Sequence, residues 1–95
     1  MNPPNHGDQR KDLTKLFIRN LGYEVDERRL GAIVEQNGPR PLDIYVVKDR
    51  ESGRSKGYGY VKFRDERDAK DAKARLDGVR IDGRSIYTDY ANMRF

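Results

Sequence analysis

The chain has 95 residues, of which 38% are charged, and its formal net charge is +4; it holds no cysteine and one histidine, His6. A chain of this length buries one modest core, and its composition argues against disulfides, zinc sites and nucleophilic catalysis by cysteine or histidine. The basic balance favours a polyanionic partner. Because no long apolar run occurs, we expect no contact with a membrane and a reducing, intracellular location.

The N-terminal part divides into an arm and a first strand. Residues 1–12 hold two prolines, a glycine and mostly polar side chains, which predicts a flexible N-terminal arm. Residues 13–21 alternate in polarity, which predicts a strand. Leu16 and Ile18 would then point to one face, and Phe17 to the other.

Two helices are predicted from capping residues and from helical spacing of apolar residues. The first begins after Asp26, an N-cap residue, and ends at Gly38, and the second begins after Asp65 and ends at Gly78. Gly31 inside the first helix predicts a close approach to the sheet. The residues expected to face the core are Leu30, Ile33 and Val34 in the first helix and Ala69, Ala72 and Leu76 in the second.

Three further strands are predicted. Residues 42–48 are rich in β-branched and aromatic side chains, residues 56–63 alternate aromatic with small or aliphatic side chains, and residues 85–90 alternate again, with Ile86 and Thr88 facing inward. The face opposite the core would then carry Tyr45, Tyr58, Tyr60, Lys62, Tyr87 and Asp89.

The order strand, helix, strand, strand, helix, strand predicts an α+β fold of the ferredoxin-like, split βαβ sandwich type. In this fold a four-stranded antiparallel sheet carries both helices on one face. The other face would expose aromatic rings beside cations, which is the surface that stacked bases on a phosphate backbone require. Tyr45 and Tyr87 have a second interpretation, in which they cover apolar surface at the sheet margin.

Two segments resemble the RNA recognition motif family. Lys56 to Phe63 is similar to its octapeptide, Lys/Arg-Gly-Phe/Tyr-Gly/Ala-Phe-Val-x-Phe/Tyr, with tyrosine at position 60 where phenylalanine is usual. Leu16 to Leu21 is similar to its hexapeptide, aliphatic-aromatic-aliphatic-x-Asn-Leu. The resemblance implies a domain over residues 13–92, followed by a C-terminal tail of residues 93–95. It implies a module that binds single-stranded RNA without catalysis, cofactor or metal, and we expect a monomer.

The resemblance also implies roles for individual residues. Family members stack bases on the aromatic residues that match Phe17 and Tyr58, and they pack sugars against the residue that matches Tyr60. The lead basic residue, here Lys56, contacts phosphate or a base edge. The predicted RNA-binding set also contains cations and residues of the sheet margin: Arg19, Tyr45, Arg54, Lys62, Tyr87, Asp89 and Asn92.

The main alternative is a protein-interaction module on the same fold. A partner on the helical face would meet Lys73 and the pair Arg28 and Arg29. The known peptide-binding variant of the family usually lacks the sheet aromatics and carries Arg-x-Phe before the last strand, where this chain keeps the aromatics and has Arg84-Ser85-Ile86. An enzyme is not expected, because no phosphate-binding glycine pattern is completed. The loop at 49–56 resembles those of splicing-related members, so we expect a role in mRNA processing or regulation in the nucleus or cytoplasm.

Overall fold

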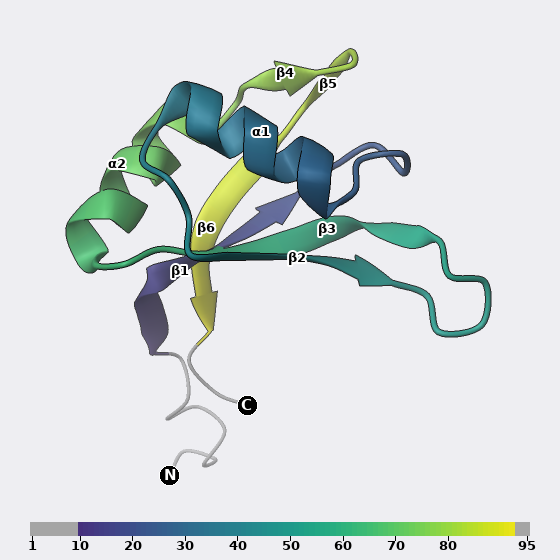
Figure 1. Ribbon diagram of the computed structural model, residues 1–95, viewed down its shortest axis with the longest axis horizontal. Helices are drawn as coiled ribbons and strands as arrows, with labels where there is room; N and C mark the ends of the chain where they lie inside the picture. The colour runs from purple at the N-terminus through teal and green to yellow at the C-terminus, as the bar shows by residue number, and fades with distance from the viewer. Residues whose placement is uncertain (1–9, 93–95) are drawn as a thin grey trace, which may run out of the picture.

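The computed structural model describes residues 10–92, and these form a two-layer fold (Figure 1). Its elements are β1 (Lys11–Arg19), α1 (Glu27–Asn37), β2 (Asp43–Lys48), β3 (Ser55–Lys62), α2 (Glu66–Leu76), β4 (Arg80–Ile81), β5 (Arg84–Ser85) and β6 (Tyr87–Asn92). Four of the strands form an antiparallel sheet in the order β2-β3-β1-β6, and β4 and β5 form a separate small hairpin. Both helices lie on the same face of the sheet (Figure 1), so the predicted ferredoxin-like α+β fold is confirmed.

Both helices begin at the predicted capping residues. The Asp26 carboxylate accepts a hydrogen bond of 2.9 Å from the Arg29 backbone N–H, and Asp65 caps α2 in the same way. Such caps satisfy backbone donors that have no partner within the helix. The prediction of a close approach at Gly31 is confirmed, because a Cβ placed there would lie 2.9 Å from Ile44 Cδ1 of β2.

The core lies between the helices and the sheet and contains every residue predicted for it on the two helices. The sheet contributes the inward side chains of alternate positions, including Leu16, Ile18, Val61 and Phe63, all fully buried. Exposing these four side chains would forfeit about 1.5–3 kcal/mol each. The opposite register of β1 and β3 is therefore excluded, and the alternating residues, among them Phe17, point away from the helices.

The first strand begins at Lys11 rather than at Leu13, so residues 11 and 12 belong to the sheet and not to the predicted arm. Lys11 pairs with Asn92 and Asp12 with Ala91, ahead of an irregularity in the β1–β6 register. Alternation of apolar residues did not reveal this pairing, because three of the four paired residues, Lys11, Asp12 and Asn92, are polar or charged. The rest of the predicted arm, residues 1–9, and the predicted tail, residues 93–95, lie outside the described residues.

The last strand of the sheet, β6, begins at Tyr87, and the prediction that it begins at Ser85 is wrong. Ile86 donates its backbone N–H to Val79 and accepts from Gly78 through its carbonyl, so this part of the chain pairs with the segment after α2 rather than with β1. The predicted inward orientation of Ile86 and Thr88 is confirmed by their burial.

Candidate nucleic-acid interface

Two cross-strand rows of side chains occupy the face of the sheet away from the helices, and together we call them the platform. In order from β2 to β6, the first row is Tyr45, Tyr60, Phe17 and Asp89, and the second row is Tyr58, Arg19 and Tyr87. Sequence alternation predicted these seven residues and Lys62 for the open face, and the strand register places the seven in two adjacent rows. Among the described residues, no helix lies over these rows.

Phe17 is the centre of an aromatic cluster on the platform. Its ring centroid lies 5.5 Å from that of Tyr58 in an edge-to-face arrangement and 5.4 Å from that of Tyr60 at a tilt of 40°. Aromatic pairs favour these separations and geometries. Each of the three rings is half-buried, so the cluster is held in place while part of its surface stays accessible. A surface ordered in advance loses less side-chain entropy when a ligand binds.

Tyr45 and Tyr87 extend the platform towards its two edges. Their exposed fractions are 58% and 43%, and neither belongs to the hydrophobic core. The Arg19 guanidinium lies 5.3 Å from the centroid of the Tyr87 ring, a distance at which a cation is attracted to an aromatic face. Both tyrosines thus lie on the platform's face, and contact with RNA remains a prediction for them.

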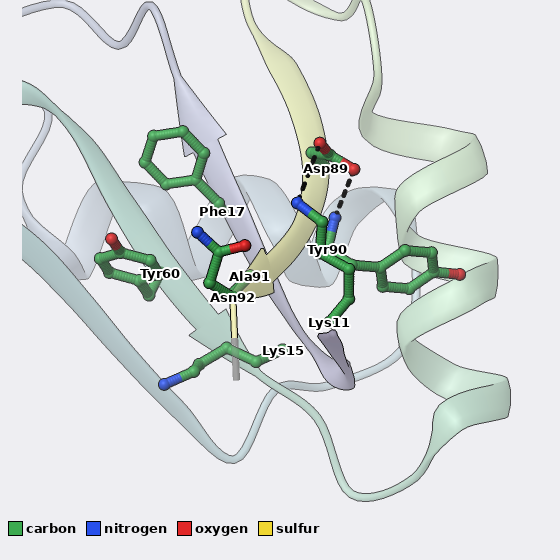
Figure 2. A pocket seen from close by; sticks show the side chains of 8 residues that line it. All are labelled: Lys11, Lys15, Phe17, Tyr60, Asp89, Tyr90, Ala91 and Asn92. Atoms are coloured by element: carbon green, nitrogen blue, oxygen red, sulfur yellow. Dashed lines mark hydrogen bonds and ion pairs between the residues drawn. The ribbon is translucent and has the colours of Figure 1, made fainter. Parts of the chain in front are cut away.

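A hollow of about 550 Å³ lies where the platform meets the end of β6 (Figure 2). Phe17, Tyr60 and Asn92 line it, together with Asp89, whose carboxylate lies 3.7 Å from Lys11 Nζ. In Figure 2 the Tyr90 ring points away from Phe17 and Tyr60. The structure therefore brings the predicted residues Asp89 and Asn92 to the aromatic cluster.

The family model for the RNA recognition motif matches residues 16–87. The chain belongs to the RNA recognition motif family. Among curated relatives of this RNA recognition motif, the glycine-rich RNA-binding protein GRP1A of Sinapis alba is 40% identical over 80 residues, which are 84% of this chain and 48% of that protein. The 28 kDa chloroplastic ribonucleoprotein of Spinacia oleracea is 38% identical over 80 residues, 84% of this chain and 34% of that protein.

A solved structure supports the same assignment. The crystal structure of RNA Binding Protein PG1 superimposes with a TM-score of 0.76 at 34% identity, covering 85% of this chain and 96% of that one. The chain spans about half the length, or less, of the two curated relatives above. The comparisons support RNA binding without enzymatic activity as the function of this RNA recognition motif.

The predicted cations of the motif have different surroundings. Lys62 donates a hydrogen bond of 2.8 Å to the Thr14 hydroxyl and lies 3.6 Å from the Asp12 carboxylate. The Thr14 hydroxyl hydrogen bond, helped by the charge of Lys62, holds the pKa of Asp12 below its ordinary value. Within the described residues, Lys56 forms no ion pair. The pKa of Asp49 is lowered mainly by the hydrogen bond from the Ser52 backbone N–H, and the charge of Lys56 contributes to the same shift.

Arg54 lies apart from the platform. It lines a hollow with Tyr23, Val25 and Lys48 at the loop between β2 and β3, and that hollow includes no platform residue. The structure therefore does not bring this predicted contact together with the aromatic cluster, because the loop carries Arg54 past the edge of the sheet.

Three residues that the predicted set lacked lie at this RNA recognition motif's candidate interface. Lys15 Nζ lies 5.6 Å from the centroid of the Tyr60 ring, and its place in the β1 alternation was a usable signal. Tyr23 and Arg84 line a hollow with Tyr58. Tyr23 lies in a loop and Arg84 in a two-residue strand, where no periodic pattern indicates orientation.

The residues proposed for a protein partner are partly engaged within the domain. Arg29 forms an ion pair of 2.9 Å with Asp82, and Lys73 Nζ lies 5.6 Å from the Tyr90 ring centroid. Arg28 is exposed on α1. Two of these three cations thus already have contacts within the domain.

Two negative findings concern only residues 10–92. No cluster of three or more histidine, cysteine, aspartate or glutamate side chains there has the arrangement of a metal site. Within the same range, no helix has the length and apolar character needed to cross a membrane.

Proposed function

We propose that this domain binds single-stranded RNA by stacking bases on Phe17 and Tyr58, packing a sugar against Tyr60 and holding phosphates with surrounding cations. The observation that carries this proposal is the half-exposed aromatic cluster centred on Phe17 on the uncovered face of the sheet. Bases can stack on such rings only when they are unstacked from their own neighbours, which favours single strands over duplexes. Two or three bases would cover the cluster.

The free energy of binding would come from two sources. Stacking contributes about 1–3 kcal/mol per base. Phosphate contacts from Lys56, Arg19 and Lys15 would add a salt-dependent contribution. Asp89 and Asn92 supply acceptors and an amide beside the rings, where base edges would lie, and Lys62 would contribute after leaving Asp12. Tyr45 and Tyr87 would extend the stacking surface at its margins.

The test is a titration of short labelled single-stranded RNAs against the wild type and a variant with Phe17→Ala and Tyr58→Ala. We expect affinity to fall at least about 30-fold, because two stacking contacts of at least about 1 kcal/mol each are lost. Leu42→Ala is the control, since it removes an exposed apolar side chain outside the platform and is expected to bind as the wild type does. Equal affinity of the double variant and the wild type, with circular dichroism unchanged, would refute the stacking mechanism.

The cellular setting is a further part of the proposal. We infer a monomeric domain that serves mRNA processing or regulation in the nucleus or cytoplasm, although one of the relatives above is chloroplastic. Imaging of the tagged protein in its own cells would decide the compartment. Amide shift mapping with RNA would address a partner on the helical face, since shifts confined to α1 and α2 would favour the protein-interaction alternative.

A further inference from the structure

A second hollow, which we call the corner hollow, is lined in part by the second row of the platform and lies where the end of β1 meets the start of β3 and the β4–β5 hairpin. Its volume is about 480 Å³, within the range of about 300–1,000 Å³ that small-molecule sites occupy. Three tyrosines and three cations line it: Tyr23, Tyr58, Tyr87, Arg19, Lys56 and Arg84. Tyr23 and Arg84 have no place in the family motifs quoted above or in the stacking cluster.

The lining of the corner hollow is positively charged. No carboxylate lines it, and among residues 10–92 no ion pair engages Arg19, Lys56 or Arg84. The hollow at the end of β6 differs, because Asp89 lies there against Lys11. Three cations in one lining that holds no carboxylate create a local positive potential that attracts an anionic group, although Asp49, outside the lining, interacts with Lys56.

Arg84 is positioned by an amide bridge. Asn20 adopts a left-handed backbone conformation with φ of 67°, which asparagine tolerates better than most residues. From there its side chain accepts a hydrogen bond of 3.0 Å from the Arg84 guanidinium and donates one of 2.7 Å to the Ser85 carbonyl. A guanidinium has five N–H donors. This neutral bridge therefore orients Arg84 and leaves its charge and most of its donors for a ligand.

Tyr23 supplies an exposed ring beside that guanidinium. Its exposed fraction is 68%, the largest among the exposed large hydrophobic side chains of the described chain. One edge of the ring lies against Gly57, where an added Cβ would be 3.4 Å from Cε1, and the Arg84 guanidinium lies 6.0 Å from the ring centroid. The Tyr23 ring is thus held at the rim of the hollow with most of its surface in solvent, and it does not belong to the hydrophobic core.

We propose that the corner hollow is a second nucleotide subsite, in which a base stacks on Tyr23 while Arg84 and Lys56 hold its phosphate. The inference rests on the proposed binding of single-stranded RNA and extends it, because the nucleotide is one that follows the bases on the platform along the same strand. Tyr58 belongs both to the aromatic cluster and to the lining of the corner hollow, so the RNA strand would pass from the cluster to the hollow without a gap.

The experiment compares single-stranded RNAs of three and seven nucleotides with the variants Tyr23→Ala and Arg84→Gln. On the longer RNA we expect Tyr23→Ala to bind at least about fivefold more weakly, the low end of the range for one lost stacking contact. Arg84→Gln is also expected to bind the longer RNA more weakly, because a phosphate contact is lost. On the shorter RNA, which only covers the platform, we expect no change. Arg84→Gln is expected to flatten the slope of log affinity against log salt by about 0.7, the contribution of one phosphate contact with a single strand. Arg84→Lys keeps the charge and is expected to keep the slope.

Arg67→Gln is the matched control, because it removes one positive charge from an exposed position on α2. The inference is overturned if Tyr23→Ala and Arg84→Gln bind the longer RNA as the wild type does while Phe17→Ala weakens binding. It is equally overturned if both RNAs lose affinity to the same extent. Failure of the proposed function itself is distinguishable, because Phe17→Ala would then leave affinity for both RNAs unchanged.

Discussion

The ion pair between Lys62 and Asp12 leads to a prediction about affinity. Lys62 faces the RNA side of the sheet, yet its ammonium lies 3.6 Å from the Asp12 carboxylate, with side-chain exposures of 43% and 23%. In water two unit charges at this separation attract one another by about 1 kcal/mol, and partly exposed pairs contribute about 0.2–1 kcal/mol when measured. RNA must offset this interaction before a phosphate can use Lys62. We therefore expect Asp12→Asn to raise RNA affinity about 1.5- to 5-fold at low salt.

The substitution is chosen to leave the local fold intact. Asp12 accepts hydrogen bonds from both the backbone N–H and the hydroxyl of Thr14, at 2.9 Å and 2.6 Å, and an asparagine carbonyl can accept the same two. The assay is fluorescence anisotropy with labelled single-stranded RNA at several salt concentrations. Screening shortens the reach of charges to about 3 Å at 1 M salt. The gain is therefore expected to shrink as salt increases.

Asp71→Asn is the control for this prediction. Asp71 also pairs with a cation, Arg75 at 2.9 Å, and its replacement changes the net charge by the same amount on α2, away from the platform. We expect it to raise affinity less than Asp12→Asn. The reasoning would be refuted if the two variants gained equally, or if the gain from Asp12→Asn were the same at every salt concentration.

Further predictions concern stability, measured by urea and thermal unfolding. Glu27→Ala is expected to lower the free energy of unfolding by about 1–2 kcal/mol, because the carboxylate accepts a hydrogen bond of 2.9 Å from the Val46 backbone N–H. Lys48→Ala removes only the exposed ion pair to Glu27, and it should lower the free energy of unfolding by less than about 1 kcal/mol. That hydrogen bond, with help from Lys48, lowers the pKa of Glu27 from 4.5. The stabilisation from the Glu27 carboxylate is therefore complete above pH 4.5 and is lost as pH falls through the lowered pKa of the folded protein. The difference in free energy of unfolding between wild type and Glu27→Gln should shrink in acid, and a constant difference would contradict this. Gly57→Ala should cost at least about 1 kcal/mol, since φ there is 86° and a Cβ would lie 3.3 Å from the Leu21 carbonyl oxygen; an unchanged urea midpoint would contradict it.

The fold and the aromatic cluster could be predicted because their signals are local. Alternation along β1 and β3 separates Leu16 and Phe63 from Phe17 and Tyr58, and a one-residue slip would expose the core, so the two faces are strongly specified. Capping by Asp26 likewise depends on residues within one turn. These features follow from neighbours in the chain, and periodicity reports such neighbours directly.

The parts that were missed depend on contacts between distant segments. Tyr23 and Arg84 meet because β1 pairs with β6 and because Asn20, at the end of β1, accepts a hydrogen bond from Arg84, 64 residues away in the chain. Arg54 was expected near the aromatic cluster, but its loop runs beyond the sheet edge. The engagement of Lys62 by Asp12 also escaped prediction, since it follows from the extra pairing of residues 11 and 12. Spacing along a sequence carries no information about such encounters.

The uneven compensation of charge described for the two hollows has a consequence for binding kinetics. At the β6 end Lys11 has its own counterion, whereas the cations of the corner hollow have none within the described residues. Long-range attraction of an approaching polyanion is therefore expected to be stronger at the corner hollow than at the β6 end, and first encounters would favour the corner. Added salt would then slow association more than it hastens release, and the aromatic cluster would set the lifetime of the complex once the strand has spread across the sheet.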